Sequence, residues 1–534
     1  MRNGLDLGGA YEATLGRIKA QGEDKARLGM AVLMWATHAQ RPLQADEICH
    51  ALAIRIGSTD LDGHDIPTIP TLLDCCQGLV TVDKGASTVR LIHVTLQEYL
   101  CTHPNLFDRA HSTIAEICLT YLNFQRDHSP NPQRTLFLDY SSLYWGTHMR
   151  MELSDGAKKF ALQLLGQFDS HISAKFLWEW ISRGFVAEYT HSRKSFSALH
   201  CISYFGIAEV ANALIDMNRW DVNQRDGAGM TPLIWAARYG HEEVVRLLLR
   251  NRHIQPDHQD AHTGRTALSW AAGNGHEAVV RLFLGPQFIN PGSIGRRWRK
   301  VPLVASLLLG RRYINPDSPS KAGRTPLSWA AENGREGVVK LLLGRKDVSP
   351  DIPDTEYGQT PLSLAAENGC ERVLELLLGR QDVNPTISSK SGQIPLSLAA
   401  ENGHEGIVRL LLGRKDTNPN SLSESGQTPL SLAAENGHEG IVKLLLGQND
   451  VNPDSSSKFG RTPLSLAAEN GHEGIVKILL GREDVNPDTP DAVFGQGPLL
   501  QAPKKRHEGV EKLLSGWDDF NLEGSSKSGR TPLS

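Results

Sequence analysis

The sequence has no run of about 18 uninterrupted apolar residues, so it predicts no membrane-spanning helix. Its first residues, MRNGLDLGGAYEATLGRIK, do not join a basic stretch to an apolar run, so we expect no secretory signal. The seven cysteines form no Cys-x-x-Cys pair and no His/Cys ligand spacing. We therefore expect a reducing, cytoplasmic location, no metal site and no cofactor.

Motifs of two catalytic classes are also missing. The chain has no Gly-x-x-x-x-Gly-Lys-Ser/Thr loop to hold nucleotide phosphates and no Gly-x-Ser-x-Gly turn to expose a nucleophilic serine. A formal net charge of −4 and a pI of about 6.6 give no general attraction to nucleic acid or to an anionic membrane. These features predict a protein that is not an enzyme, with no small-molecule substrate, no nucleic-acid partner and no membrane partner.

Well over half of the chain repeats one phrase. GQTPLSLAAENGHEGIVKLLLG begins at Gly426 and returns as GRTPLSLAAENGHEGIVKILLG at Gly460, 34 residues later. The Thr-Pro-Leu anchor of the phrase recurs at Thr231, Thr325, Thr360, Thr428, Thr462 and Thr531, with variants at Ser197, Thr266, Val301, Ile394 and Gly497. A fixed period of this length indicates a repeat architecture.

Each copy predicts a pair of short helices. Thr428 is a suitable N-cap, and Pro429 fits the first helical position, where a missing N–H costs nothing. Gly437 and Gly447 end the two helices, which are about two turns long. Helices shorter than about 12 residues are marginal alone in water, so these must pack against copies of themselves. The connector is rich in turn residues and is expected to project as a loop or finger.

From Ser197 to the end, this pattern closely resembles the ankyrin repeat. The resemblance implies a mainly α-helical ankyrin-repeat solenoid over residues 196–534. Two features depart from the family: the connector is a residue or two longer, and Ser431 and Ser465 stand where the family usually has histidine. The second departure puts the usual polar ladder between repeats in doubt.

The array is irregular in two places. Only 24 residues separate Val301 from Thr325, about one helix too few, and we predict that a fault here divides the stack; an error in the gene model is the alternative. The copy that begins at residue 497 is degenerate, because Pro503 falls inside its first helix. We expect a frayed or truncated C-terminal end, with fast amide exchange beyond Gln496.

Residues 1–105 do not repeat. Asp24–Ala39 and Pro42–Ile54 have helical spacing, a short helix follows, and the strands LVTVD and TVRLIHV form a hairpin across Lys84-Gly85 before a last helix, TLQEYL. Three helices and a two-stranded wing predict a winged-helix domain. Between Arg55 and Lys84 there are acidic residues but no lysine or arginine, which argues against DNA binding.

The phrases LMWATHAQRPLQADEICHAL and RLIHVTLQEYLCTH resemble the winged-helix segment that follows the NTPase core of fungal NACHT-type STAND signalling proteins. That segment is often catalogued under the name of a GPI inositol-deacylase, and such proteins commonly end in ankyrin arrays. The resemblance implies the regulatory or sensor part of such a protein without its NTPase, as a truncated paralogue or as a piece of a longer chain.

Residues 106–195 predict a helical linker between the winged helix and the repeats. The segment carries a group of aromatic residues, namely Tyr140, Tyr144, Trp145, Phe176, Trp178 and Trp180. We interpret them as core that covers the open apolar end of the first repeat. A stripe for partner docking is the alternative.

Histidines recur one repeat apart, at His404, His438 and His472. Stacked helices lie about 8–10 Å apart and Zn–N bonds measure about 2 Å, so equivalent histidines cannot share an ion. We interpret them as making structural hydrogen bonds between loops. Arg335 and Cys370 occupy equivalent positions, which a ligand role would not tolerate.

Other conspicuous residues also favour structural interpretations. Glu405, Glu439 and Glu473 form a periodic row that we interpret as a polar rim. Cys75-Cys76 lies in an apolar helix and predicts buried thiols. Trp235, Trp270 and Trp329 occupy one repeat position that later copies fill with leucine. We interpret these tryptophans as core filling, with binding as the alternative.

Partners of ankyrin proteins usually contact the finger tips and the exposed positions of the first helix of each repeat. Carried onto this chain, those positions are Arg238, Tyr239, Arg265, Arg324, Gln359, Gln393, Gln427 and Arg461. The hypothesis is a non-catalytic scaffold that binds an unidentified protein partner, acting as the sensor part of a NACHT–ankyrin signalling protein. The alternatives are a hydrolase, as the catalogue name would suggest, and a nonfunctional truncated gene product.

Overall fold

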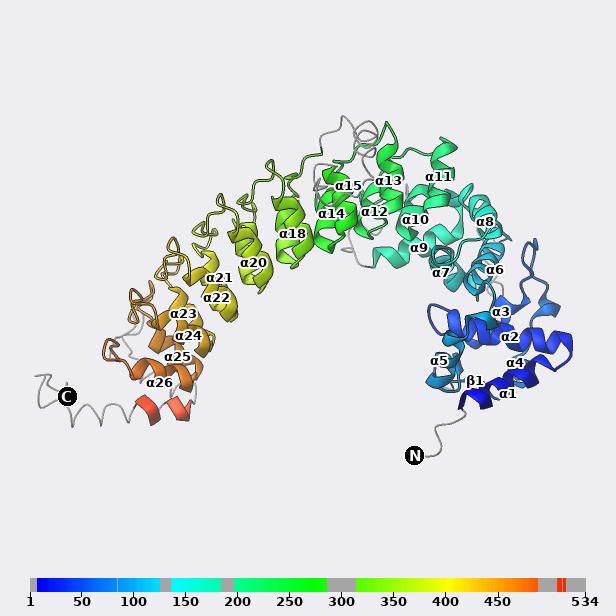
Figure 1. Cartoon of the computed structure of the whole chain (residues 1–534), viewed down its shortest axis with the longest axis horizontal. Helices are drawn as coiled ribbons and strands as arrows, with labels where there is room; N and C mark the ends of the chain where they lie inside the picture. The colour runs from blue at the N-terminus through cyan, green and yellow to red at the C-terminus, as the bar shows by residue number, and fades with distance from the viewer. Residues whose placement is uncertain are drawn as a thin grey trace, which may run out of the picture. The chain divides into compact units, whose positions relative to one another are not determined.

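The protein is mainly α-helical in a computed structural model that describes residues 7–83, 85–124, 136–183, 196–285, 314–487, 507–510 and 512–514. These residues form two compact units (Figure 1). The first unit contains residues up to 255 together with 260–262, and the second contains 256–259 and the residues from 263 onward. The predicted degenerate copy with Pro503 lies almost entirely outside the described residues.

The first unit begins with the predicted winged helix. Its elements are α1 (Leu7–Lys19), α2 (Glu23–His38), α3 (Ala45–Ala53), η1 (Gly63–Asp65), α4 (Ile69–Cys75), β1 (Val80–Val82), β2 (Val89–Leu91), α5 (Val94–Thr102) and η2 (Pro104–Leu106). The two strands pair antiparallel with Val80 opposite Leu91, which confirms the predicted wing. Trp35 of α2 is fully buried and meets Phe137 and Tyr140 edge-on, so the wing domain and the following helices share apolar packing.

A helical segment follows the winged helix. It contains α6 (Ala110–Phe124), α7 (Leu138–Met151), α8 (Asp155–Leu165), η4 (Phe168–Ser170) and α9 (Ile172–Ser182). Of the aromatic group, Tyr140, Trp145 and Trp178 are buried, as the core interpretation predicts, whereas Trp180 is exposed. The Trp145 ring lies 5.1 Å from that of Phe205 in the first repeat helix, where a side chain at Gly146 would collide with Phe205.

The first unit ends with two helix pairs of the repeat type. These are α10 (Ala198–Phe205) with α11 (Ala208–Asp216), and α12 (Pro232–Arg238) with α13 (Glu242–Arg250). Helix α7 packs on α10 and α8 packs on α11. The linker helices therefore cover the apolar side of the first pair, as expected from the sequence.

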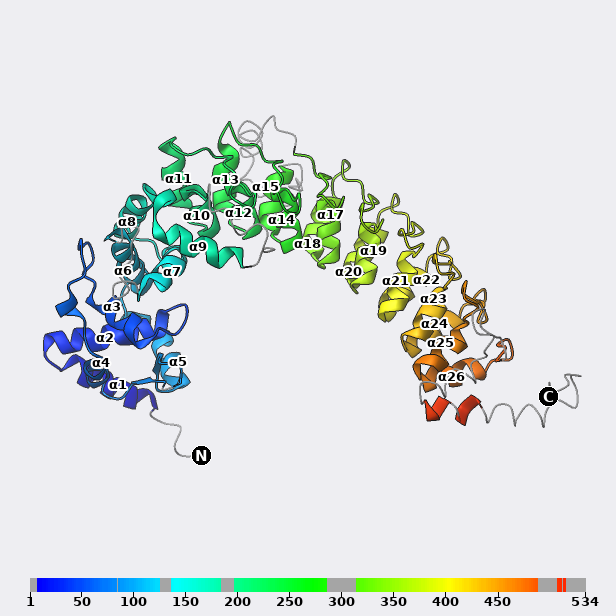
Figure 2. The ribbon, with the colours of Figure 1, turned by 180° about the vertical axis from the view of Figure 1, so that it is seen from behind.

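The second unit is a row of helix pairs, seen from two sides in Figures 1 and 2. The pairs are α14 (Ala267–Asn274) and α15 (Glu277–Leu284), α17 (Pro326–Glu332) and α18 (Glu336–Leu343), α19 (Pro361–Glu367) and α20 (Glu371–Leu378), α21 (Pro395–Asn402) and α22 (Glu405–Leu412), α23 (Pro429–Glu435) and α24 (Glu439–Leu446), and α25 (Pro463–Asn470) and α26 (Glu473–Leu480). The first helix of each pair packs on the first helix of the next.

The ends of the helices follow the sequence signals. The Thr428 hydroxyl accepts a hydrogen bond from the Ser431 N–H, and Pro429 takes the first helical position. Gly403 ends α21 with φ 83°, a left-handed conformation that glycine adopts without strain. A Cβ there would also lie 2.7 Å from the His438 ring of the next repeat, so the turn is tied to the stacking.

Two sets of polar bonds join successive pairs. In one set, Arg380 Nη1 donates to the carbonyl of Leu343 (3.1 Å) and Arg414 Nη1 to that of Leu378 (3.3 Å), at the C-terminal end of the preceding second helix. Each of these arginines also pairs with an aspartate two residues later. The last carbonyl groups of a helix have no hydrogen-bond partner within the helix. These arginines bind such carbonyls from the neighbouring repeat and therefore act as C-terminal caps. Gln448 replaces the arginine in one repeat.

The other set confirms the interpretation of the histidines. Nε2 of His404 lies 2.9 Å from the carbonyl oxygen of Glu367, and Nε2 of His438 lies 2.9 Å from that of Glu401. Arg335, in the equivalent position, donates to the carbonyl of Gly273 (3.2 Å). Histidine or arginine therefore binds the equivalent carbonyl at the end of the first helix in the preceding repeat.

The predicted fault between Thr266 and Thr360 is wrong for the described part of the array. Helix α14 packs directly on α17, and Lys321 N donates to the Thr263 carbonyl (2.9 Å) as the later fingers do to one another. Arg345 Nη1 likewise donates to the Leu284 carbonyl (2.7 Å). The short copy at 301–324 falls mostly within residues 286–313, outside the described residues. The pairs on either side of it make the regular inter-repeat bonds.

Candidate functional site

The fingers are the turn segments that precede each first helix. Their backbones are joined in series, since Lys390 N donates to the Tyr357 carbonyl (2.7 Å) and Glu424 N to the Ser391 carbonyl (2.7 Å). Together with the adjoining sides of α17, α19, α21, α23 and α25 they form a continuous surface, which we call the finger face. A surface built from repeated backbone bonds holds its side chains in a fixed register.

A polar pair recurs on the finger face of each of these repeats. A glutamate at the end of the first helix meets the side chain eight residues earlier, just before the helix N-cap. The five pairs are Arg324–Glu332 (2.7 Å), Gln359–Glu367 (2.6 Å), Gln393–Glu401 (2.5 Å), Gln427–Glu435 (2.6 Å) and Arg461–Glu469 (3.0 Å). Arginine partners neutralise their glutamates, whereas the glutamine amides only donate hydrogen bonds.

The finger face is hollowed beside these pairs. One hollow, about 510 Å³ in volume, lies between the fingers and α19 and α21, and Glu367, Glu401 and Tyr357 are among the residues that line it. A neighbouring hollow of about 430 Å³ also contains Tyr357 and Glu367, and it reaches Arg324. The two share lining residues, so they form one groove along the row of pairs, which we call the finger groove.

Of the residues predicted as contact positions, Arg324, Gln359 and Gln393 line these hollows, and the first two are largely covered. The Arg324 side chain is only 13% exposed and Gln359 only 7%, because each is folded down against its glutamate. The sequence analysis missed Glu367 and Glu401, which line the groove, and Glu435, which holds the equivalent position in the next repeat. Together with Glu469 they are the glutamates of the four copies of the phrase LAAEN, and only the recurring eight-residue offset from a variable Gln or Arg indicated a pair.

Arg238, Tyr239 and Arg265 lie beside the tryptophans. In the first unit, Trp235 is fully buried and donates from Nε1 to Asp226 Oδ2 (2.7 Å), as core filling predicts; Arg238 lies over its ring and Tyr239 is exposed.

Trp270 and Trp329 in the second unit are partly exposed, so they fill core volume less completely than Trp235 does. The Arg265 guanidinium stands 4.5 Å from the Trp270 ring centre and 3.2 Å from that of Trp329. This cation–π stack joins two repeats.

Other predicted candidates have the structural roles expected of them. Glu405, Glu439 and Glu473 are exposed first residues of second helices, where a negative charge favours the helix dipole. Cys75 and Cys76 are buried, and burial raises the pKa of the Cys76 thiol to about 12. In the described part of the chain, no three His, Cys, Asp or Glu side chains are grouped so as to hold a metal ion.

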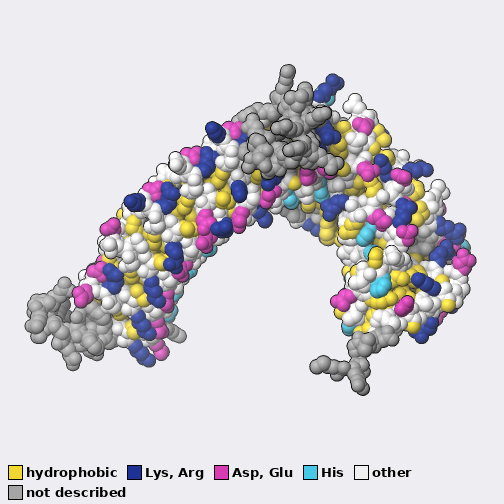
Figure 3. All heavy atoms as spheres, in the orientation of Figure 1, with side chains coloured by type: hydrophobic (Ala, Val, Ile, Leu, Met, Phe, Trp, Pro, Cys, Tyr) yellow, Lys and Arg dark blue, Asp and Glu magenta, His cyan; other side chains and the backbone are white. Residues whose placement is uncertain are grey.

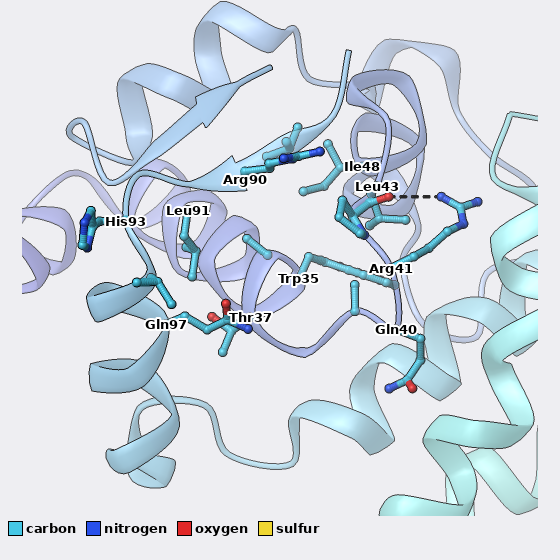
Figure 4. A pocket seen from close by; sticks show the side chains of 15 residues that line it. Trp35, Thr37, Gln40, Arg41, Leu43, Ile48, Arg90, Leu91, His93 and Gln97 are labelled. Carbon is cyan, nitrogen blue, oxygen red and sulfur yellow. Dashed lines mark hydrogen bonds between the residues drawn. The ribbon is translucent and has the colours of Figure 1, made fainter. Parts of the chain in front are cut away.

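The winged helix contains a hollow of about 450 Å³, shown in Figure 4. Arg41 at its edge donates to both carboxylate oxygens of Glu47 (2.6 and 2.7 Å) and to Asp139 (3.1 Å), and the ion pair with Glu47 raises the pKa of the Arg41 guanidinium. The remaining labelled side chains, such as Trp35, Leu43 and Gln97, provide no acid–base pair. The Arg41 guanidinium therefore joins the α3 carboxylate of Glu47 to Asp139 of α7.

None of the helices that the structure describes is long and apolar enough to cross a membrane. A segment of 73 residues is 37% identical to protein phosphatase 1 regulatory subunit 12A of Mus musculus and, equally, of Rattus norvegicus. The match covers 14% of this chain and 7% of each relative, so the chain spans only a small part of those proteins.

Two family models match the chain. The model described as "GPI inositol-deacylase, winged helix domain" matches residues 17–112, which include the wing. The model described as "Ankyrin repeats (3 copies)" matches residues 175–260, 199–293, 298–389, 373–455 and 396–491, together more than half of the 534 residues. With the stacked helix pairs, the fingers and this match in agreement, the chain belongs to the ankyrin-repeat family.

Proposed function

We propose that the chain is a non-catalytic scaffold that binds a protein partner on the finger face of its repeats. The observation that supports this most directly is the finger groove, a fixed, polar and hollowed surface repeated over successive pairs. Five of the predicted contact residues, Arg324, Gln359, Gln393, Gln427 and Arg461, belong to the polar pairs on that face. Stacked repeats offer extended surfaces of this kind to other proteins.

The finer part of the proposal is a regulatory or sensor role in a NACHT-type signalling protein. The order of a winged helix followed by ankyrin repeats supports it, as does the NACHT-like phrase around Trp35. The likeness to a phosphatase regulatory subunit fits the broader idea of regulation through binding. Mapping transcripts across the gene tests this part, because an NTPase encoded upstream is expected if the role is correct.

The binding role is tested by affinity capture with the full chain and with a variant that lacks whole repeats between Thr360 and Gly481. Circular dichroism of the variant must first show that the remaining repeats stay helical. Captured proteins are expected to disappear with the repeats, and binding of the same proteins by both forms would refute the role. No observation on the finger face or in the winged helix favours hydrolysis over binding.

A further inference from the structure

The charge of the finger groove is uneven along the row of repeats. At both ends of the series an arginine neutralises its glutamate, in the Arg324–Glu332 and Arg461–Glu469 pairs. The three repeats between them have glutamine instead, and among the described residues Glu367, Glu401 and Glu435 form no ion pair with lysine or arginine. Glu367 and Glu401 line the groove, and Glu435 holds the equivalent position one repeat further along the finger face, so this stretch presents three carboxylates without a neutralising lysine or arginine among the described residues.

The fingers add to this charge. Glu356 and Glu424 line the larger hollow together with Glu367 and Glu401, and Lys390 is its one basic residue. The Lys390 ammonium donates to the Thr355 carbonyl (2.6 Å), so it is held at the finger. Acidic and basic side chains are interspersed over the visible side of this unit in Figure 3, whereas the charged groups that line the larger hollow are four carboxylates and one ammonium.

The carboxylates are also held in place before any partner arrives. Each accepts a hydrogen bond from its glutamine amide, and the backbone carbonyl of each glutamate is bound by a histidine of the next repeat. A preorganised charge loses little conformational entropy on binding, so it contributes more to affinity than a flexible surface glutamate does.

Large apolar side chains stand exposed on fingers near the two ends of this acidic stretch. Tyr357 is 52% exposed and Phe459 is 54% exposed, although most large apolar residues of the array are buried. Exposed aromatic side chains rimmed by polar residues mark surfaces that bind other proteins. They point to a ligand of macromolecular length, and the carboxylates exclude a nucleic-acid backbone by their sign.

The spacing of the carboxylates defines the form of the ligand. Stacked helices lie about 8–10 Å apart, which is too far for neighbouring glutamates to share one metal ion at about 2.0–2.6 Å. An extended polyproline II segment advances about 3.1 Å per residue and turns every third side chain to the same side, so three residues cover one repeat. We propose that the finger groove binds an extended segment of a partner protein with lysine or arginine at every third position, one for each of Glu367, Glu401 and Glu435.

This proposal rests on the binding role proposed above and names the chemistry of the partner. Its test uses the full chain and a labelled synthetic peptide of about 12 residues with arginine at every third position and serine or alanine elsewhere. Fluorescence anisotropy measures Kd at low and high salt. A peptide with glutamate in place of arginine is the reference, and its binding is expected to be much weaker.

The decisive variant carries Glu367→Gln, Glu401→Gln and Glu435→Gln. Glutamine keeps the volume and can still accept the amide hydrogen bond, so only the charge is lost. The matched control carries Glu371→Gln, Glu405→Gln and Glu439→Gln, which remove the same charge from the second helices of the same repeats.

Three exposed or half-exposed ion pairs correspond to about a tenfold rise in Kd for the groove variant, with little change for the control. Similar effects of the two triple variants, or no measurable binding of the arginine peptide to the wild-type chain, would overturn the proposal. If affinity capture still required the repeats in that case, the binding role would stand and only the basic ligand would be wrong.

A gain-of-binding variant tests the spacing. Arg461→Gln removes the cation that neutralises Glu469 and extends the acidic stretch by one repeat. A peptide lengthened by one three-residue arginine step is then expected to bind about two- to fivefold more tightly than it binds the wild type. Arg409→Gln, on the second helix α22, is the control and is expected to leave Kd nearly unchanged. Equal Kd values for all three proteins would contradict the proposed register.

Discussion

Replacing Ser397 by alanine is expected to stabilise the second unit, although the same change in neighbouring repeats destabilises it. In those repeats the serine hydroxyl lies beside the N-cap threonine: the Ser363–Thr360 oxygens are 3.1 Å apart and the Ser431–Thr428 oxygens 3.0 Å. Ile394 replaces the threonine before Ser397. Ser397 is only 1% exposed, and without the threonine its hydroxyl has no hydrogen-bond partner among the described residues.

The magnitude follows from this difference. Leaving a hydroxyl buried and unpaired costs about 1–3 kcal/mol, and alanine also has the better helix propensity by about 0.5 kcal/mol. Ser397→Ala is therefore expected to raise the free energy of unfolding by at least about 1 kcal/mol, the low end of the cost of the unpaired hydroxyl. Ser431→Ala removes a made hydrogen bond, which contributes about 1 kcal/mol, so that variant is expected to lose roughly 0.5 kcal/mol after the gain in propensity.

The assay is hydrogen exchange of the full chain followed by mass spectrometry. Repeat arrays do not unfold in one step, and exchange reports the opening of individual helix pairs. Amides of α21 and its neighbours are expected to exchange about fivefold more slowly in Ser397→Ala and faster in Ser431→Ala. Faster exchange in both variants would show that the Ser397 hydroxyl has a partner and would refute the reasoning.

Three further outcomes are expected. Gln448→Arg restores the cap that arginine supplies in other repeats and should slow exchange in the preceding helix, raising local stability by about 1 kcal/mol; a faster rate would contradict this. Cys370→His replaces the 3.8 Å contact of the Cys370 thiol with the Glu332 carbonyl by the shorter histidine–carbonyl hydrogen bond that His404 makes in the next repeat. The free energy of unfolding in urea is expected to rise by about 1 kcal/mol, and an unchanged or lower urea midpoint would contradict this. In the first unit, burial lowers the pKa of His148 to about 3 and of His200 to about 4. Because these values lie below about 6.5, the unfolded chain binds more protons in between, and stability falls as pH drops below about 6.5. Each histidine costs about 2 kcal/mol at pH 5, partly offset by Asp226, whose burial raises its pKa to about 6; a midpoint of thermal unfolding that does not fall between pH 7.5 and pH 5 would contradict this.

Much of the fold could be predicted from short stretches of sequence. The N-cap of Thr428, the proline after it and the glycines at helix ends all act within one helix pair, so the periodic phrase predicted the pairs correctly. The same holds for the wing, where both strands and their turn lie within residues 80–91. Local signals of this kind depend on backbone conformation and need no knowledge of distant contacts.

The fault predicted after Thr266 shows where such reasoning fails. Counting residues between anchors treats each copy as one layer of the stack, whereas α14 packs directly on α17 despite the intervening 286–313. Stacking depends on which apolar faces meet, and a long insertion between neighbours has a small entropic cost.

The candidate site depends on structure for a related reason. Repetition in the sequence was enough to require stacked helix pairs, because such short helices cannot stand alone in water. The finger groove required the folded chain. Gln359 and Glu367 are eight residues apart, and the histidine that fixes the Glu367 backbone is 37 residues away at His404. Whether a repeated glutamate is neutralised depends on the side chain eight residues earlier, which the folding of its own repeat brings within hydrogen-bonding distance. The histidine that fixes the glutamate backbone comes from the next repeat, and only the packing of one repeat on the next brings it close.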